Sequence, residues 1–215
     1  MPYNLCLFDL DGTLTDPLLG ITRAFQYTLL KYGIQETTEN LTRFIGPPLR
    51  ESFSDYLGIS IADTEKAVAI YREYFTKTGI FENIIYPDIP AILQKLVDSK
   101  KTLSVATNKV TLYAEQILEH FDVSKYFSFV SGDEMDSSKS TDGKHEIVRI
   151  ALDRLDPERK MSAVMIGDRK HDIIGAKDNC IDSIGVLWGY GSRDELESAG
   201  ATHIAETPDA LLHLL

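Results

Sequence analysis

The sequence has no long apolar run, no internal repeat and no low-complexity segment in its 215 residues. Because a membrane-spanning helix needs about 20 mostly apolar residues, we expect no membrane span. The first four residues lack a basic lead and run directly into an apolar segment, so we expect no secretory signal peptide. These absences predict a globular, cytoplasmic protein without a membrane partner.

Cysteines and basic residues are also scarce. Cys6 and Cys180 lie far apart, without the spacing of a metal site, and we predict two structural thiols in a reducing cytosol. Lys and Arg number 22 against 33 Asp and Glu, which gives a net charge of −11. Proteins that bind nucleic-acid phosphates need a basic surface, so this balance disfavours a nucleic-acid partner. The length allows one large or two small domains.

Short apolar segments alternate with amphipathic segments over most of the chain, as in a parallel sheet covered by helices. The predicted strands are residues 5–8, 102–106, 127–130, 163–166 and 183–187. The predicted helices are residues 89–99, 111–120, 145–155 and 172–179. Near the C-terminus, two further helix starts are indicated by Ser192 with Glu195 and by Thr207 with Pro208. The predicted fold class is α/β, with a doubly wound parallel sheet.

A helical segment interrupts this alternation just after the first strand. Residues 17–82 contain no good strand pattern. Apolar side chains recur there at helical spacing, as in Ile21, Phe25 and Leu29. We predict an α/β core formed by residues 1–16 and 86–215, and a helical domain formed by residues 17–85.

Two aspartates follow the first predicted strand. Residues 5–8 are apolar without alternation, which favours a strand buried on both faces, and Asp9 and Asp11 come directly after it. Parallel sheets bind ligands at the carboxyl ends of their strands, and the spacing of two points both carboxylates the same way if the strand continues. Gly12 then permits a sharp turn. A simple acidic turn is the alternative interpretation, since Asp and Gly favour turns.

Other polar residues follow two later strands. Asp168 follows the strand at 163–166, and Asp172 stands at a helix start, where an acid can also be a simple cap. Carboxylates at these positions suit Mg²⁺, a hard cation that prefers oxygen ligands. Thr107 and Asn108 follow the strand at 102–106 and can donate hydrogen bonds to a phosphate, although a threonine there can equally be a helix N-cap.

Four stretches in this order resemble the motifs of the haloacid dehalogenase superfamily, within it the aspartate-dependent phosphatases. They are DLDGTLTD at 9–16, VATNK at 105–109, DGKHEIV at 142–148 and GDRKHDIIGA at 167–176. The resemblance is closest to phosphatases with a small helical cap, including phosphoglycolate phosphatases and 5′-nucleotidases. It implies a Rossmann-like core with residues 17–85 as an inserted cap domain.

The resemblance also implies roles. Asp9 would be the nucleophile and Asp11 the general acid and base. Mg²⁺ would be held by Asp9, Asp168 and the backbone carbonyl of Asp11, with Asp172 orienting the surroundings of the metal. The phosphoryl group would be bound by Thr107, Asn108 and Lys144. Lys139 is a second candidate for the motif lysine, because the family's lysine often precedes proline whereas His145 follows Lys144.

Substrate choice would be made in the cap, where Leu49, Arg50 and Phe53 are candidate contacts. His171 is interpreted as a surface residue. The sequence thus predicts a Mg²⁺-dependent phosphatase for small phosphorylated metabolites, phosphoglycolate phosphatase-like, with 5′-nucleotidase activity as the alternative. The physiological substrate and the oligomeric state are not predicted.

The motif residues bear on three rival functions. Dehalogenases of the superfamily lack the second aspartate of the first motif, which Asp11 supplies here. Phosphosugar mutases place a histidine just after that motif, and residues 16–23 contain none. The third rival, from a different class, is a catalytically silent phosphate-binding module on the same scaffold.

Overall fold

The computed structural model describes residues 3–58, 60–135 and 141–215. The chain forms two compact units, one made of residues 1–15 and 85–215 and the other of residues 16–84. Two short strands, β2 (Thr15–Asp16) and β3 (Ile84–Ile85), pair with each other where the chain leaves the first unit and returns to it. We call these the α/β unit and the helical unit.

A parallel six-stranded sheet organises the α/β unit, in the order β5-β4-β1-β6-β7-β8. The strands are β1 (Leu5–Phe8), β4 (Thr102–Val110), β5 (Phe129–Asp133), β6 (Ala163–Gly167), β7 (Asp182–Val186) and β8 (His203–Ala205). From β1 the chain builds outward through β4 to β5, then crosses back to add β6 on the other side of β1. Sheets of this kind bind ligands at the strand ends where the strand order reverses, which here is between β1 and β6.

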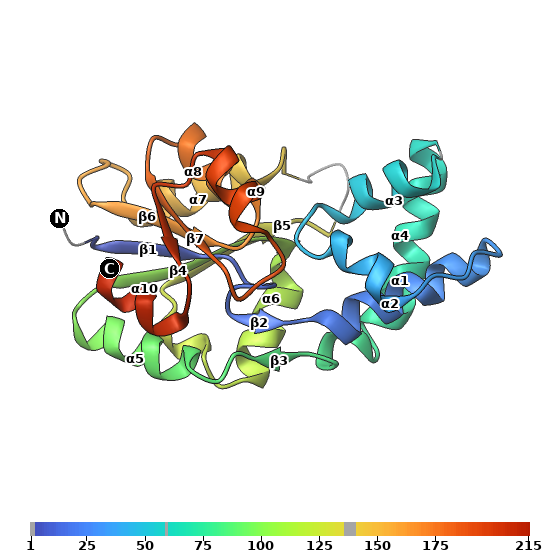
Figure 1. The fold of residues 1–215 in the computed structure, drawn as a ribbon, viewed down its shortest axis with the longest axis horizontal. Coiled ribbons are helices and arrows are strands. Elements are labelled where there is room, and N and C mark those ends of the chain that lie inside the picture. Colours follow the sequence, from blue (N-terminus) through green and yellow to red (C-terminus); the bar gives the residue numbers. More distant parts are fainter. Residues whose placement is uncertain (1–2, 59, 136–140) are drawn as a thin grey trace. The chain divides into compact units, whose positions relative to one another are not determined.

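Helices cover both faces of this sheet (Figure 1). One face carries α7 (Lys144–Leu155), α8 (Lys170–Asp178) and α9 (Arg193–Ala199), and the other carries α5 (Ile89–Asp98), α6 (Thr111–His120) and α10 (Pro208–Leu214). Leu5 and Leu7 of β1 pack in a cluster with Ile147 and Ala151 of α7. Every side chain of β1 is buried because the strand is covered on both faces.

The predicted fold class is confirmed, with differences at individual strands. β8 was not predicted, because a strand of three residues is too short to show a periodicity. β5 begins two residues later than predicted. β4 extends to Val110 rather than ending at Ala106, because a change of register between these two residues lets the strand bulge and then continue.

The helical unit contains α1 (Leu18–Lys31), α2 (Thr38–Leu41), α3 (Leu49–Leu57) and α4 (Ile61–Phe75). Its core is aromatic: the ring of Phe25 lies 4.6 Å from that of Phe53 and 5.3 Å from that of Tyr71, between centroids. Phe53 is completely buried among these rings. Of the three candidate contacts in this unit, Phe53 is therefore excluded, because its side chain is buried in the core of the unit.

Glycines let two segments of the helical unit meet closely. Gly20 on α1 donates its backbone N–H to the Glu82 carbonyl oxygen at 3.0 Å. A β-carbon on Gly20 would overlap the carbonyl oxygen of Gly79, which begins a short 3₁₀ turn (Gly79–Phe81). The start of α1 is thus fastened to the chain segment that leads back to the α/β unit.

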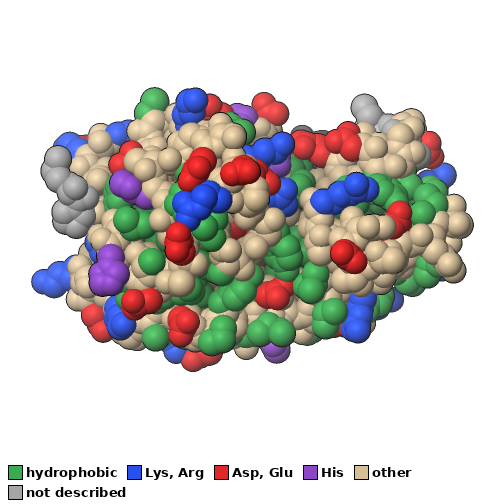
Figure 2. Space-filling model, in the orientation of Figure 1, with side chains coloured by type: hydrophobic (Ala, Val, Ile, Leu, Met, Phe, Trp, Pro, Cys, Tyr) green, Lys and Arg blue, Asp and Glu red, His purple; other side chains and the backbone are tan. Residues whose placement is uncertain are grey.

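Charged side chains of both signs are interspersed over the face of the molecule seen in Figure 2. Among the described residues, no helix is long and apolar enough to cross a membrane. Both cysteines are free thiols, but only Cys6 is buried. Cys180 is exposed, so its interpretation as a structural thiol is wrong.

We predict that Gly20→Ala destabilises the protein. Alanine favours helix over glycine by about 1 kcal/mol, but overpacking against the Gly79 backbone should cost about 1–3 kcal/mol beyond that gain. Thermal unfolding should then show Tm lowered by roughly 2–10 °C. Leu19→Ala, at an exposed neighbouring position on the same helix, is the control. A Gly20→Ala protein that melts higher than the parent would show that this contact is absent.

Candidate active site

Three buried carboxylates meet at the carboxyl ends of β1 and β6. Asp9 follows β1, Asp168 follows β6, and Asp172 lies in the first turn of α8. Their exposed fractions are 3%, 0% and 1%, and an oxygen of each lies within 4.8 Å of the other two. The backbone N–H of Asp9 donates to the Ile166 carbonyl at 2.8 Å, which continues the pairing of the two strands to the site.

Lys144, the first residue of α7, joins two of these carboxylates. Its Nζ lies 2.8 Å from Asp9 Oδ1 and 2.8 Å from Asp172 Oδ1, and it donates a hydrogen bond to the Ala106 carbonyl at 2.8 Å. Burial disfavours its charge, but attraction to Asp172 and Asp9 outweighs this effect, so the pKa of Lys144 is raised and the ammonium stays charged. The alternative candidate, Lys139, lies outside the described residues.

Asp168 is held by two loops. Its Oδ2 accepts a 2.7 Å hydrogen bond from the Tyr190 N–H, and its Oδ1 lies 3.4 Å from the Thr13 hydroxyl. The Trp188 indole N–H donates to the Thr13 carbonyl at 3.0 Å, which ties the loops together. A β-carbon on Gly189 would overlap Asp168, so only glycine allows this approach. Burial, followed by repulsion from Asp172 and Asp9, raises the pKa of Asp168 well above its usual value.

Asp172 is both a cap of α8 and a member of the carboxylate cluster. Its Oδ2 accepts a 3.0 Å hydrogen bond from the Arg169 N–H at the start of α8, which is the capping role. Its Oδ1 faces Lys144, which makes it part of the carboxylate cluster. Burial raises its pKa to about 6, with the attraction of Lys144 opposing that rise.

Asp11 does not belong to this cluster and forms an ion pair with Lys109 instead. Its Oδ2 lies 2.7 Å from Nζ of Lys109, and both side chains are about nine-tenths buried. Among the described residues, none donates a hydrogen bond to the buried Oδ1. Burial raises the pKa of Asp11, and Lys109 counteracts part of that rise.

Thr107 and Asn108 lie on the bulge of β4, next to β1. Thr107 is not a helix N-cap, because α6 begins four residues later at Thr111 with Val110 as its cap. Its hydroxyl instead accepts a 3.3 Å hydrogen bond from the Lys109 N–H. The bulge therefore brings a hydroxyl, an amide and an ammonium to one strand end.

The remaining predicted residues lie outside this cluster. Leu49 and Arg50 begin α3 of the helical unit, where Arg50 Nε donates to Glu65 Oε1 at 2.7 Å. His171 is partly buried rather than a surface residue, which corrects the expectation. Burial, aided by Lys170 and Arg169, lowers its pKa.

Lys109, Tyr190 and Trp188 were not predicted to contribute. The sequence around Lys109 does not indicate where its side chain points, because that direction depends on the bulge of β4. The loop at 188–190 lies about twenty residues after Asp168 in the chain and reaches it only through the fold.

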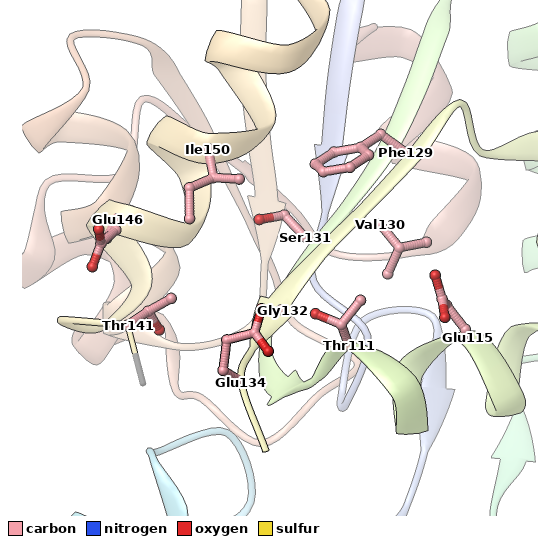
Figure 3. Close-up of a pocket in the computed structure, with 10 residues that line it drawn as sticks. All are labelled: Thr111, Glu115, Phe129, Val130, Ser131, Gly132, Glu134, Thr141, Glu146 and Ile150. Atoms are coloured by element: carbon pink, nitrogen blue, oxygen red, sulfur yellow. The ribbon is translucent and has the colours of Figure 1, made fainter. Parts of the chain in front are cut away.

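A groove of about 500 Å³ flanks β5, the edge strand of the sheet (Figure 3). Val130 and Ser131 of β5 face opposite sides, toward α6 and α7 respectively. The lining contains none of the three clustered aspartates, so the groove is separate from the carboxylate site.

The charges of the cluster suit a divalent cation. Three buried carboxylates face one ammonium, and burial, followed by repulsion between the carboxylates, raises the pKa values of Asp168 and Asp172. Hard oxygen donors in this arrangement match the preference of Mg²⁺ for carboxylates. The residues present therefore fit such an ion.

Known proteins share this architecture over the whole chain. The family model "Haloacid dehalogenase-like hydrolase" matches residues 6–186. A 5′-nucleotidase of Pseudomonas aeruginosa is 42% identical, covering 99% of this chain and 96% of the relative. A phosphoglycolate phosphatase of Aquifex aeolicus is 29% identical over 87% of this chain and 86% of its own length.

Solved structures agree. The crystal structure of a predicted phosphatase from Clostridium acetobutylicum superposes with a TM-score of 0.93 at 43% identity, covering 100% of this chain and 98% of that one. The predicted family is confirmed, and with it the prediction of an enzyme that hydrolyses phosphate monoesters. The chain belongs to the haloacid dehalogenase-like hydrolases, in their phosphatase branch.

Proposed function

We propose that the protein is a Mg²⁺-dependent phosphatase that hydrolyses small phosphate monoesters through an aspartyl-phosphate on Asp9. The observation that carries this proposal is the buried meeting of Asp9, Asp168 and Lys144 at the reversal point of the sheet. A carboxylate nucleophile divides ester hydrolysis into two easier displacements.

Asp9, Asp168 and the backbone carbonyl of Asp11 would hold the metal ion, and Asp172 would orient these ligands through Lys144. When bound, Mg²⁺ would offset the negative charge of the phosphoryl group and of the surrounding carboxylates.

Lys144 engages Oδ1 of Asp9, which leaves Oδ2 as the attacking atom. In the first step a bond forms between Asp9 and phosphorus, the ester P–O bond breaks, and Asp11 gives its proton to the departing oxygen. The raised pKa of Asp11 favours the protonated form that this step needs. In the second step Asp11 takes a proton from water, whose oxygen attacks phosphorus and frees Asp9.

The phosphoryl oxygens would be bound by the Thr107 hydroxyl, the Asn108 side-chain amide and the Lys144 ammonium. The first two come from the bulge of β4, beside Asp9. Charge-assisted hydrogen bonds of this kind bind phosphate more strongly than neutral ones do.

For the substrate, we place nucleoside 5′-monophosphates ahead of phosphoglycolate, which reverses the order drawn from the sequence. The support is the higher identity to the relative named as a 5′-nucleotidase, 42% against 29%. We further propose that the helical unit acts as the cap that selects substrates, and that the enzyme works in the reducing cytoplasm, with which its two free thiols agree.

The metal proposal predicts a fluorescence response from Trp188, the single tryptophan of the chain. Mg²⁺ should change its emission saturably, because Thr13 links the indole to Asp168. The apparent affinity should be lower at pH 5.5 than at pH 7.5, since protons compete for Asp168 and for Asp172, whose pKa is about 6. Asp168→Asn should abolish the response, and Asp209→Asn, an exposed site, should not. An unchanged titration in Asp168→Asn would contradict the assignment.

The two aspartates should separate kinetically. Asp9→Asn removes the nucleophile and should form no phosphoenzyme. Asp11→Asn loses a group usually worth roughly 10²–10⁴-fold, but nitrophenyl phosphate needs little protonation of its leaving group. In Asp11→Asn the first displacement from nitrophenyl phosphate should therefore still proceed in part, whereas hydrolysis of the phosphoenzyme should be strongly slowed. Intact-mass analysis of Asp11→Asn should show one added phosphoryl group on Asp9. A phosphoryl group on another residue would contradict the assignment of Asp9 as the nucleophile.

The helical unit should control substrate choice. Leu49→Ala or Arg50→Ala should change the ratio of kcat/KM between a nucleoside monophosphate and phosphoglycolate by roughly 10-fold, with little effect on the Mg²⁺ titration. Glu65→Gln is the matched control, because it weakens the ion pair but keeps Arg50. Equal effects of Arg50→Ala and Glu65→Gln would assign Arg50 to helix packing instead.

A further inference from the structure

We infer that Lys109 is a positioning residue for Asp11: its ammonium fixes one carboxyl oxygen, so that the other is presented for the two proton transfers. This inference rests on the proposed acid–base role of Asp11.

The contact between the two side chains distinguishes the oxygens of Asp11. Oδ2 lies 2.7 Å from Lys109 Nζ, and the exposed fractions of the two side chains are 7% for Lys109 and 10% for Asp11. Oδ1 is buried and receives no hydrogen bond from any described residue. A carboxyl group held at one oxygen keeps a defined rotamer, and a proton-transfer group must lie within about 3 Å of its partner to work. Oδ1 is therefore the oxygen that gives up and accepts the proton.

The bulge of β4 explains how Lys109 reaches Asp11. Ala106 pairs with Ser131 and Val110 with Asp133, so four steps along β4 match only two along β5. Bulges redirect side chains and are common beside active sites. The extra residues are accommodated at Gly132 of β5, where a β-carbon would overlap the Lys109 carbonyl oxygen. Figure 3 shows Gly132 close to Thr111, at the start of α6.

Two other roles for Lys109 make different predictions. If it binds the phosphoryl group directly, its loss should weaken every ester and inorganic phosphate alike. If it only balances buried charge for folding, its loss should lower stability without discriminating between esters. A positioning role acts through Asp11, so its loss should penalise the esters that need protonation most.

The test measures kcat/KM, which reports the first displacement, for an alkyl phosphate and for nitrophenyl phosphate. Lys109→Met should lower the value for the alkyl ester by roughly 10²-fold and for nitrophenyl phosphate by much less. Competitive inhibition by inorganic phosphate should be unchanged. Lys109→Arg, which keeps the charge in another geometry, should fall between the parent and Lys109→Met.

The decisive measurement is a double-mutant cycle. In an Asp11→Asn background, Lys109→Met should cause no further loss for either ester, because residues that act through one group are not additive. Lys109→Met alone leaves the Asp11 carboxylate buried without a compensating charge. The double variant removes that carboxylate as well, so it should fold even if the single variant does not. Additive losses, or inhibition by phosphate weakened in parallel with kcat/KM, would overturn the inference.

Lys101→Met is the matched control for removing a partly buried lysine. Lys101 Nζ donates to the Tyr3 and Leu215 carbonyls at 2.8 and 2.7 Å, away from the site. It should lower Tm without changing the ratio between the esters, and an equal change of ratio would overturn the inference. If Asp11→Asn itself shows no dependence on the leaving group, the acid–base proposal fails and this inference with it. If Asp11→Asn shows that dependence and Lys109→Met does not, only the inference fails.

Discussion

The interaction on which the structure depends is the ion pairing of the buried Lys144 with the buried side chains of Asp9 and Asp172. Removing charges from water is expensive, and a buried charge persists only with partners. Lys144 compensates part of the charge of three aspartates, which leaves a net attraction for a cation. It also connects β1, α7 and α8, so that the geometry of the carboxylate cluster and the packing of the α/β unit rest on the same contacts.

Sequence reasoning reached most of this site because its residues follow strands. An apolar segment that ends in Asp9, and another that ends in Gly167 and Asp168, are local patterns, and parallel topology then requires their ends to meet. The same logic predicted Thr107 and Asn108. Lys144 needed the family resemblance as well, because a lysine before a helix is otherwise an ordinary surface residue.

The residues that were missed are those whose positions depend on tertiary contacts. Lys109 stands beside predicted residues, but the register change that aims it at Asp11 depends on Gly132, more than twenty residues away. Tyr190 binds Asp168 through its backbone N–H, which any residue type could supply, and the Trp188 indole binds the Thr13 carbonyl, a contact that only the folded loops bring about. Phe53 was a candidate contact for a related reason: the sequence does not distinguish an aromatic side chain near a ligand site from one in a core.

The pairing of β2 with β3 has a consequence for how such chains diversify. The two chain segments that pass between the units, β2 and β3, pair with each other. The two ends of the inserted segment therefore lie side by side, and for the α/β unit the insertion is a closed loop. The entropy of closing a loop grows only slowly with its length, so the inserted segment can lengthen, shorten or be exchanged at little cost to the sheet. The helical unit can then change in length and sequence while the strands and the carboxylate cluster of the α/β unit stay as they are.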